Sequence, residues 1–442
     1  MNTPLRLLAA VVALGLVAGC DLVELEDRPN PNGPALDDVL DNPTRPAIAN
    51  LAVGVEASSR VALGTYLVDV GMIGREYWRV SPSDPRFTTD LLGAAESVLD
   101  NNTFYITQPW AARYATVRNA NTMLLALDAN ATLTDAQKAA GRGFARTWIA
   151  YQYLLNLNLT YDNGVRFIEP GDREAGPLVT VGPALDRIAG LLDQADADLA
   201  AGGAGAFFFP ASVGVGVPNT VAGYRQINRA LAARVDAYRA DWAGVQQALA
   251  GSFVDAAGPL TDGAYHLFSN GPGDFANPFF FPLNGGGDGV LAHPTFVTDI
   301  AAGDNRRSKV QARTSARTFD GLTSAFDVDV YKTPTSPVPI VRRAELVLLR
   351  AEAAAQLGNA AAAVAALNVV RTAAGLPAYA GPTTTAALVD EVLRQRRFEL
   401  YAEGHRWIDL RRYDRLGTLP IDRPTDDVFR QFPVPESDAQ DT

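Results

Sequence analysis

Two carboxylates near the C-terminus, Glu399 and Glu403, have a spacing that could carry acid/base chemistry. They are four residues apart in a segment predicted to be helical, so they share one helix face. Paired carboxylates of this kind hydrolyse glycosides when one of them has a raised pKa. Arginines flank the pair and would hold both groups ionised, which leaves no poised acid. We therefore predict a structural ion-pair network here and no catalytic residue.

The predicted network also includes cations and a further acid on either side of Gly404. Gly404 can end the helix in a left-handed conformation, and the chain would then fold back toward the acids. The members of the network are Arg396, Glu399, Glu403, Arg406 and Asp409.

Other catalytic and cofactor chemistry has few candidate residues. The chain has three histidines, none with metal-ligand spacing, and a single cysteine. The glycine run at 285–289 does not stand between a predicted strand and a helix, so it is not a phosphate-binding loop. We predict no metal, no cofactor and no enzymatic activity.

The single cysteine, Cys20, ends a segment with the layout of a secretory signal. Arg6 precedes an apolar run over residues 7–17, and small residues stand directly before the cysteine. The run is shorter than the roughly 20 apolar residues that span a bilayer. The site resembles the cleavage and acylation site of bacterial lipoproteins. We expect residues 1–19 to be a signal peptide and Cys20 to be lipidated.

Composition and net charge limit the classes of partner that the protein can bind. The net charge is −11 and 48% of the residues are hydrophobic, which favours a large packed core and argues against nucleic acid as a partner. Residues 20–46 contain a proline-rich stretch that cannot be helix or central strand, so we expect a tether. The expected contact with the membrane is through the lipid alone.

Aromatic residues among charged and polar ones form the candidate binding surface. Such groups suit carbohydrates, because a sugar ring stacks on an aromatic face while polar side chains bond its hydroxyls. Candidate regions are residues 75–87, 101–110 and 265–281. The predicted ligand-binding residues are Tyr77, Trp78, Arg79, Arg86, Tyr265 and Phe279. Trp78 is the first choice for a stacking residue.

Helical periodicity predicts a mainly α scaffold of antiparallel hairpins. The expected helices are 46–63, 101–128, 134–155, 183–201, 221–240, 241–249, 341–357, 360–374 and 384–403. A Thr134-x-x-Gln137 capping box starts one of them. Repeated hairpins suggest tetratricopeptide-like stacking. We expect one domain over 47–442, made of an N-terminal half (47–250), a loop insertion (251–339) and a C-terminal part (340–442).

The C-terminal third carries a recognisable set of motifs. They are the segment 343–353 followed by Leu357-Gly358-Asn359, the segment 366–371 followed by Ala374-Gly375-Leu376-Pro377, the segment 396–411, and Phe432-Pro433-Val434-Pro435-Glu436. These resemble the SusD/RagB family, as do the weaker motifs Asn119-Ala120-Asn121 and 143–159. Gln395 departs from the Glu that is usual in the family.

The resemblance implies a function as well as a fold. It implies a SusD-like helical scaffold with long irregular ligand-facing loops, on a lipid-anchored protein of the outer membrane that faces the cell exterior. It also implies binding of an oligosaccharide or other oligomeric nutrient, and delivery to a SusC-like TonB-dependent transporter. Two alternatives stay open: an all-α glycoside hydrolase, and a non-catalytic structural or assembly lipoprotein.

Overall fold

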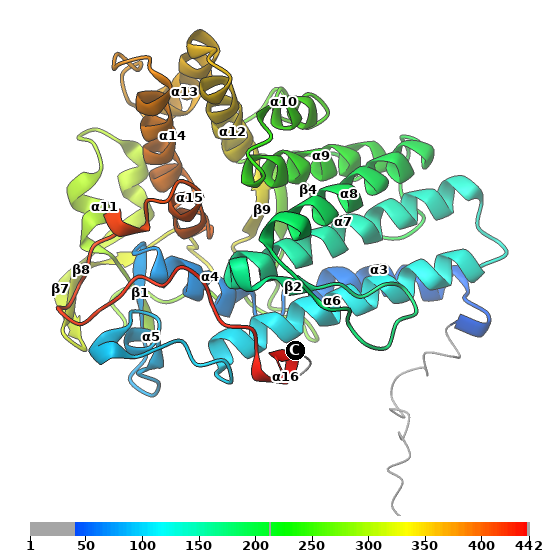
Figure 1. The fold of residues 1–442 in the computed structure, drawn as a ribbon, viewed down its shortest axis with the longest axis horizontal. Coiled ribbons are helices and arrows are strands. Elements are labelled where there is room, and N and C mark those ends of the chain that lie inside the picture. The colour runs from blue at the N-terminus through cyan, green and yellow to red at the C-terminus, as the bar shows by residue number, and fades with distance from the viewer. Residues whose placement is uncertain (1–39, 212–213, 440–442) are drawn as a thin grey trace, which may run out of the picture.

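The computed structural model describes residues 40–211 and 214–439, and helices dominate it (Figure 1). The predicted signal segment, Cys20 and most of the predicted tether lie outside the described residues. The longer helices are α3 (Arg45–Ser58), α4 (Leu63–Ile73), α6 (Phe104–Ala129), α7 (Asp135–Thr160), α8 (Val181–Ala201), α9 (Val221–Tyr238), α10 (Trp242–Ala250), α12 (Arg343–Gln356), α13 (Ala360–Ala373) and α14 (Thr385–Glu399). The shorter ones are α5 (Arg86–Thr89), α11 (Pro294–Asp299), α15 (Arg406–Arg412) and α16 (Glu436–Ala439), with the 3-10 turns η1 (Ala94–Glu96), η2 (Tyr161–Asn163), η3 (Asn305–Lys309) and η4 (Leu416–Thr418).

The helices pack as consecutive antiparallel pairs, which confirms the predicted tetratricopeptide-like scaffold. The pairs are α6 with α7, α8 with α9, α10 with α12, and α13 with α14. Figure 1 shows α6 to α9 side by side in one half of the molecule and α12 to α14 beyond them. No helix in the described part of the chain is both long and apolar enough to cross a bilayer.

Local sequence signals explain several of the helix ends. The Thr134 hydroxyl accepts a hydrogen bond from the Gln137 backbone amide, and the Gln137 side-chain oxygen accepts one from the Thr134 amide. The predicted capping box is therefore present. Gly404 has a φ of 83°, as expected for a residue that ends a helical segment. Three predicted helix ends are wrong: the first helix ends at Ser58 and not at residue 63, α7 continues past residue 155 to Thr160, and α14 ends at Glu399 and not at residue 403.

Small sheets come mainly from the insertion 251–339, for which we predicted no regular element. One sheet has the antiparallel order β1-β6-β8-β7, and another has the order β4-β5-β9. A two-stranded pair joins β2 to β3. The strands are β1 (Tyr77–Val80), β2 (Val165–Arg166), β3 (Leu178–Val179), β4 (Gly214–Val215), β5 (Gly263–His266), β6 (Gly289–Ala292), β7 (Val310–Phe319), β8 (Leu322–Val328) and β9 (Val338–Arg342). Strand β1 lies more than 200 residues before β6 in sequence, so the sheet joins the N-terminal half to the insertion.

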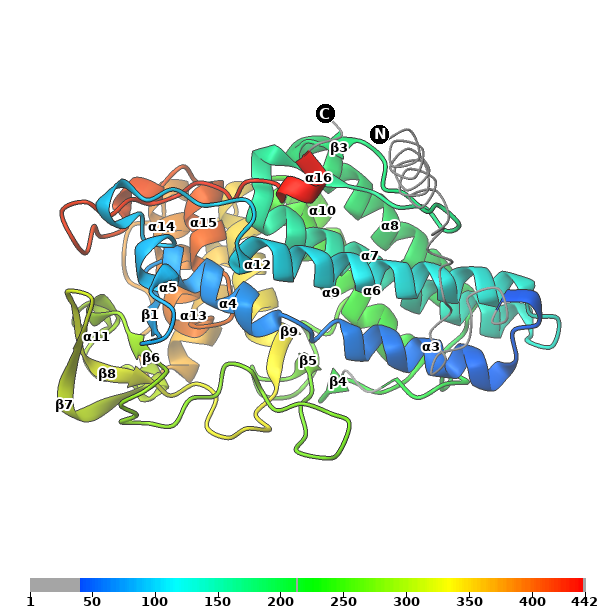
Figure 2. The same ribbon diagram turned by 90° about the horizontal axis from the view of Figure 1, so that it is seen from below.

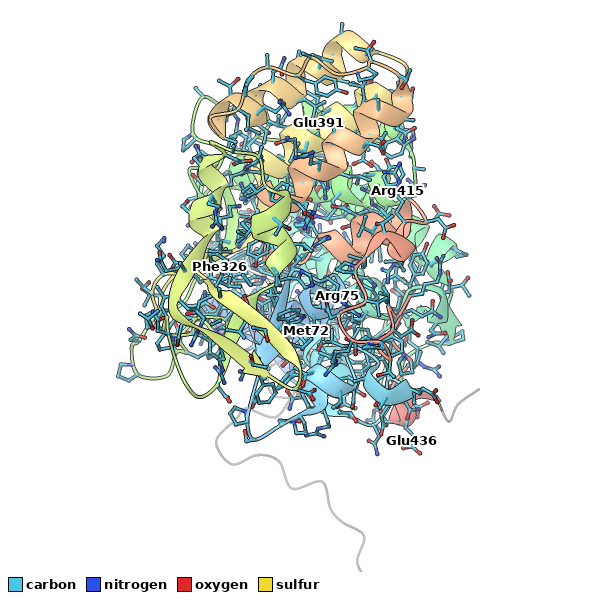
Figure 3. The ribbon with its side chains drawn as sticks, turned by 90° about the vertical axis from the view of Figure 1, so that its left-hand side faces the viewer. Met72, Arg75, Phe326, Glu391, Arg415 and Glu436 are labelled. Carbon is cyan, nitrogen blue, oxygen red and sulfur yellow. The ribbon has the colours of Figure 1, made fainter. Side chains whose placement is uncertain are left out.

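The C-terminal segment, mostly irregular between α15 and α16, ties the two halves together. It runs from α15 past α4 and α5 and ends at α16 beside α6 (Figures 1 and 2). The Phe432 amide donates to the Leu159 carbonyl at 2.8 Å, and the Asp427 amide donates to Leu92 at 2.7 Å. Arg75, labelled near the centre of Figure 3, donates to the Asp427 carbonyl at 2.6 Å. One contiguous hydrophobic core extends from Ile48 to Val434.

Candidate ligand-binding site

The predicted stacking residues Tyr77 and Trp78 lie in the core. Tyr77 is fully buried and its hydroxyl donates to the Leu67 carbonyl at 2.6 Å. Trp78 is 3% exposed, and its indole nitrogen donates to Asp422 at 3.1 Å. The prediction that Trp78 presents an open aromatic face is therefore wrong. Its charged sequence neighbours do not mark an exposed surface, because its ring packs edge-on against His293 inside the sheet.

Two further predicted ligand contacts are also buried. Tyr265 is 6% exposed on β5, and its hydroxyl donates to the Thr261 carbonyl. Phe279 is 3% exposed and packs edge-on against Tyr77, with ring centroids 5.0 Å apart. Both rings serve the core, so the prediction of open ring faces is wrong for them too. In the region 101–110, Trp110 is likewise buried and bonds Asp438 at 2.9 Å.

Arg79 and Arg86, by contrast, reach the surface. Arg79 is partly exposed at the end of β1 and lies beside a cavity of about 450 Å³. We call this cavity the aromatic pocket. Its lining comes from the α3–α4 turn, the start of α4, β1, α5 and the segment 275–281, and comprises Arg60, Val61, Ala62, Gly64, Thr65, Val68, Arg79, Phe87, Phe275, Ala276, Pro278 and Phe281. Arg86 is exposed next to Phe87 but does not line the pocket.

The aromatic pocket brings together two of the three predicted regions, through residues adjacent to those we selected. Tyr77 and Phe279 form an inner pair in the core. Two residues further along each segment, Arg79 lies over the Phe281 ring at 4.5 Å and forms an outer pair. On β1, Tyr77 and Arg79 face the same side because alternate strand residues do. The predicted residues Tyr77 and Phe279 thus lie on the correct two segments but form the buried pair.

Each arginine of the aromatic pocket has a ring and a carboxylate as partners. The Arg79 guanidinium also lies 5.3 Å from the Phe87 ring, and it donates to Asp288 at 2.8 Å. This bond from Arg79 is the main cause that lowers the pKa of Asp288. Arg60 lies over the Phe275 ring at 4.7 Å and pairs with Asp274 at 2.8 Å.

Close backbone approach fixes the shape of the aromatic pocket. Helix α4 runs against the segment 275–281 at Gly64, where a Cβ atom would come within 2.8 Å of Pro278. Ala62, at the turn before α4, has a φ of 52°. Phe275 is 39% exposed and stands at the rim. Arg60 was not predicted as a site residue, and no signal in the sequence relates it to a phenylalanine more than 200 positions away.

The charged cluster around Glu399 and Glu403 differs from the predicted network in its main cation. Arg342, at the end of β9, donates to Glu399 Oε1 at 2.9 Å and to Glu403 Oε1 at 2.8 Å. Burial raises the pKa of Glu399, but Arg342 and Lys309 outweigh it and bring that pKa to about 2. A carboxylate held in its ionised form has no proton to donate, so Glu399 does not fit the acid of a glycosidase.

Arg396 and Asp409 form a separate pair, and Arg406 belongs to neither group. Arg396 Nε lies 2.7 Å from Asp409 Oδ2, and Arg412 binds the other oxygen of Asp409 at 3.0 Å. Arg406 donates instead to the Arg75 carbonyl at 2.8 Å. The prediction that Arg406 folds back onto Glu399 or Glu403 is therefore wrong. The α15 helix carries its side chain away from those acids, toward α11.

Comparison with known proteins agrees with this architecture. Residues 314–440 match the SusD family. A stretch of 98 residues is 37% identical to SusD-like protein P38 from Formosa agariphila, and it spans 20% of this chain and 20% of that protein. The chain thus aligns with about a fifth of the length of this relative.

Solved structures resemble the fold over most of the chain. NanU of B. fragilis superposes with a TM-score of 0.66 at 16% identity and covers 93% of this chain and 98% of its own. A SusD-like carbohydrate binding protein from Bacteroides vulgatus gives 0.64 at 15% identity, covering 84% and 83%. Surface glycan-binding protein A from Bacteroides uniformis gives 0.62 at 18% identity, covering 84% and 88%.

A scaffold of helical hairpins is the fold that these structures share with this chain. The chain therefore has a SusD-like fold, and its C-terminal region, residues 314–440, matches the SusD family.

Proposed function

We propose that this protein binds an oligosaccharide in the aromatic pocket and delivers it to a SusC-like TonB-dependent transporter. The observation that carries the proposal is the outer layer of Arg79, Phe87 and Phe281, which lines an open cavity of about 450 Å³. Aromatic faces can stack on the apolar face of a sugar, and the guanidinium N–H groups can donate to its hydroxyls. The carboxylate partners of Arg60 and Arg79 balance their charges, which suits an uncharged ligand.

The comparisons support this proposal at the level of the class. The B. vulgatus structure is described as that of a carbohydrate binding protein, and the B. uniformis structure as that of a surface glycan-binding protein. Other oligomeric nutrients that combine apolar faces with hydrogen-bonding groups could occupy the same pocket. Calorimetry against a panel of ligands would identify the one that binds.

Binding and not hydrolysis is the proposed activity. A glycosidase needs two carboxylates at one cleft with their pKa values pushed apart. Glu399 and Glu403 instead share the buried cation Arg342, and the pKa of Glu399 is about 2. Capture and delivery of a ligand need no covalent step.

The anchor and the partner complete the proposal. Lipidation of Cys20 would hold the protein at the outer membrane, facing outward, where a transporter barrel could receive the ligand. Cys20→Ala should release the protein from the membrane fraction, and the wild-type protein should co-purify from mild detergent with a TonB-dependent transporter. Unchanged membrane association of the variant would contradict the anchor.

The binding test uses a matched pair of phenylalanine variants. Phe281→Ala removes a ring of the aromatic pocket, while Phe326→Ala removes a similarly half-buried ring on β8, outside the pocket. Calorimetry against a panel of neutral oligosaccharides should show that Phe281→Ala weakens binding more than tenfold, about 2 kcal/mol, as for an aromatic anchor. Phe326→Ala should bind as the wild type does. Equal affinities of all three proteins would place the ligand elsewhere.

A further inference from the structure

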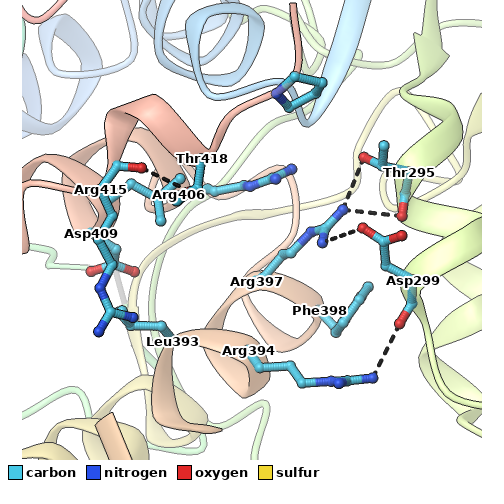
Figure 4. A pocket seen from close by; sticks show the side chains of 12 residues that line it. Thr295, Asp299, Leu393, Arg394, Arg397, Phe398, Arg406, Asp409, Arg415 and Thr418 are labelled. Carbon is cyan, nitrogen blue, oxygen red and sulfur yellow. Dashed lines mark hydrogen bonds and ion pairs between the residues drawn. The ribbon is translucent and has the colours of Figure 1, made fainter. Parts of the chain in front are cut away.

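A second cavity, of about 530 Å³, lies among α11, α14, α15 and the segment 415–420. It shares no lining residue with the aromatic pocket. Its lining carries four arginines and two aspartates, together with apolar side chains such as Leu393 and Phe398. We call it the arginine pocket. Figure 4 shows Arg394, Arg397 and Arg406 reaching from α14 and α15 toward α11.

Both aspartates of the arginine pocket are already engaged. The two oxygens of Asp409 bind Arg396 and Arg412, neither of which lines the cavity. Asp299 Oδ2 binds Arg397 at 2.8 Å. The fourth arginine of the lining, Arg415, pairs with Asp390 outside the cavity. These pairs leave no lining carboxylate for the two other arginines.

Arg394 and Arg406 therefore face the cavity without an anionic partner. Within residues 40–211 and 214–439, no carboxylate lies within 4.0 Å of either guanidinium. Arg406 donates to the Arg75 carbonyl at 2.8 Å, and Arg394 donates to the Asp299 carbonyl at 3.2 Å. The Nε atom of Arg397 is buried and has no hydrogen-bond partner in the same part of the chain. Apart from their carbonyl bonds, the guanidinium groups of Arg394 and Arg406 have no hydrogen-bond partner among the described residues and can donate to a ligand.

The electrostatics of Arg406 agree with an unmatched positive charge. Burial, followed by the charge of the neighbouring Arg397, lowers its pKa to about 9. The acid whose charge acts most on Arg406 is Glu76, but burial raises the pKa of Glu76 to about 8. At neutral pH Glu76 is therefore largely protonated and does not balance Arg406. A bound anion would relieve this repulsion, and the apolar walls would strengthen its attraction.

We propose that the arginine pocket binds an oxyanion group, such as the carboxylate, sulfate or phosphate of a small ligand. Arginine is the side chain best suited to such groups, because its planar guanidinium offers parallel donors to two oxygens. Arg406 and Arg394 would provide both the charge and the donors. The Thr295 hydroxyl, which already accepts from Arg397 at 2.9 Å, holds that guanidinium at the cavity wall.

Titration of the purified protein with three probes tests this site. Inorganic sulfate, inorganic phosphate and D-glucuronate are added at constant ionic strength, and binding is followed by calorimetry and by the melting temperature. We expect at least one probe to bind saturably. Arg406→Gln should weaken that binding at least tenfold, because a charged partner is lost in a desolvated site. The preferred probe would tell whether a free inorganic anion or a sugar acid is the source.

Two more variants keep the test independent of folding. Arg394→Gln removes an exposed cation of the same pocket, should fold normally, and should weaken binding several-fold. Arg350→Gln is the control. It removes the exposed pair between Arg350 of α12 and Asp255, outside the arginine pocket, and should leave binding unchanged. The proposal is overturned if no probe binds saturably, or if Arg394→Gln and Arg406→Gln both bind as the wild type does.

Discussion

The aromatic pocket and the arginine pocket use the same cationic side chain in opposite ways. In the aromatic pocket, Arg60 and Arg79 each have a carboxylate partner at 2.8 Å and lie over a phenylalanine ring. In the arginine pocket, Arg394 and Arg406 have only carbonyl partners among the residues that the structure describes. A guanidinium with its charge balanced serves as a flat donor surface for an uncharged polyol. A guanidinium without that balance attracts an anion.

The two pockets also differ in what builds them. Loop 275–281 and the strand end at Arg79 form much of the aromatic pocket, and loops tolerate changes that alter a binding surface. Helices α14 and α15 form much of the arginine pocket, and the buried Asp409 of α15 is part of its wall. The comparison therefore predicts that changes behind the arginine pocket affect stability, while changes at the aromatic pocket affect binding.

The largest expected effect comes from Asp409, the buried carboxylate in the wall of the arginine pocket. Asp409→Asn would leave Arg396 and Arg412 buried without their shared anion, which should lower the free energy of unfolding by about 3–5 kcal/mol. Asp255→Asn breaks the exposed pair with Arg350 and should cost at most about 1 kcal/mol. Urea unfolding measures both. Similar losses in the two variants would contradict the assignment of Asp409 to the buried structural layer.

A pH-dependent effect should come next, from Glu76 beneath Arg406. Its pKa is raised from 4.5 to about 8, chiefly by burial. Between these values the folded state holds a proton that the unfolded state has released, so stability falls as the pH rises, by about 1.4 kcal/mol per unit. Glu76→Gln mimics the protonated form and should remove this slope. The difference in unfolding free energy between variant and wild type, followed from pH 4 to 9, should grow in favour of the variant.

Some elements of the structure could be predicted from the sequence and others could not. The helical hairpins were predictable because apolar period and caps such as Thr134 act within a few residues. The core pair Tyr77–Phe279 and the pocket pair Arg79–Phe281 could not be told apart. Both pairs join the same two segments, and the depth of each depends on how α4 packs over them. That packing involves residues such as Gly64 and Pro278, which are more than 200 positions apart.

The charged clusters show the same limit. Glu399, Glu403, Arg396 and Asp409 were predicted to form ion pairs because they are close in sequence. The main cation of the glutamates is Arg342, 57 residues before Glu399, which only the end of β9 brings near. Arg406 is adjacent in sequence to the predicted network and yet faces another cavity. Spacing along one helix fixes a face, but it does not fix which distant element lies opposite.

A smaller effect should separate Trp78 from its neighbour Arg79. Trp78→Phe keeps a ring in the core but loses the hydrogen bond to Asp422, which should cost about 1–3 kcal/mol of stability. Oligosaccharide affinity should stay within twofold of the wild type, because Trp78 does not line the aromatic pocket. Thermal unfolding and calorimetry on one sample check both. A variant with wild-type stability but lost oligosaccharide binding would show that Trp78 contacts the ligand.

The smallest expected effect is that of salt on ligand affinity, which should differ between the aromatic pocket and the arginine pocket. Raising the salt concentration from 0.1 M to 1 M shortens the Debye length from about 10 Å to about 3 Å. Affinity for a neutral oligosaccharide should change less than about twofold, because the arginines of the aromatic pocket are paired and the ligand carries no charge. Anion binding at the arginine pocket should weaken several-fold over the same range. Titrations of both ligands in sodium chloride would measure this, and an equally strong salt dependence would mean that the ligand of the aromatic pocket is itself recognised through charge.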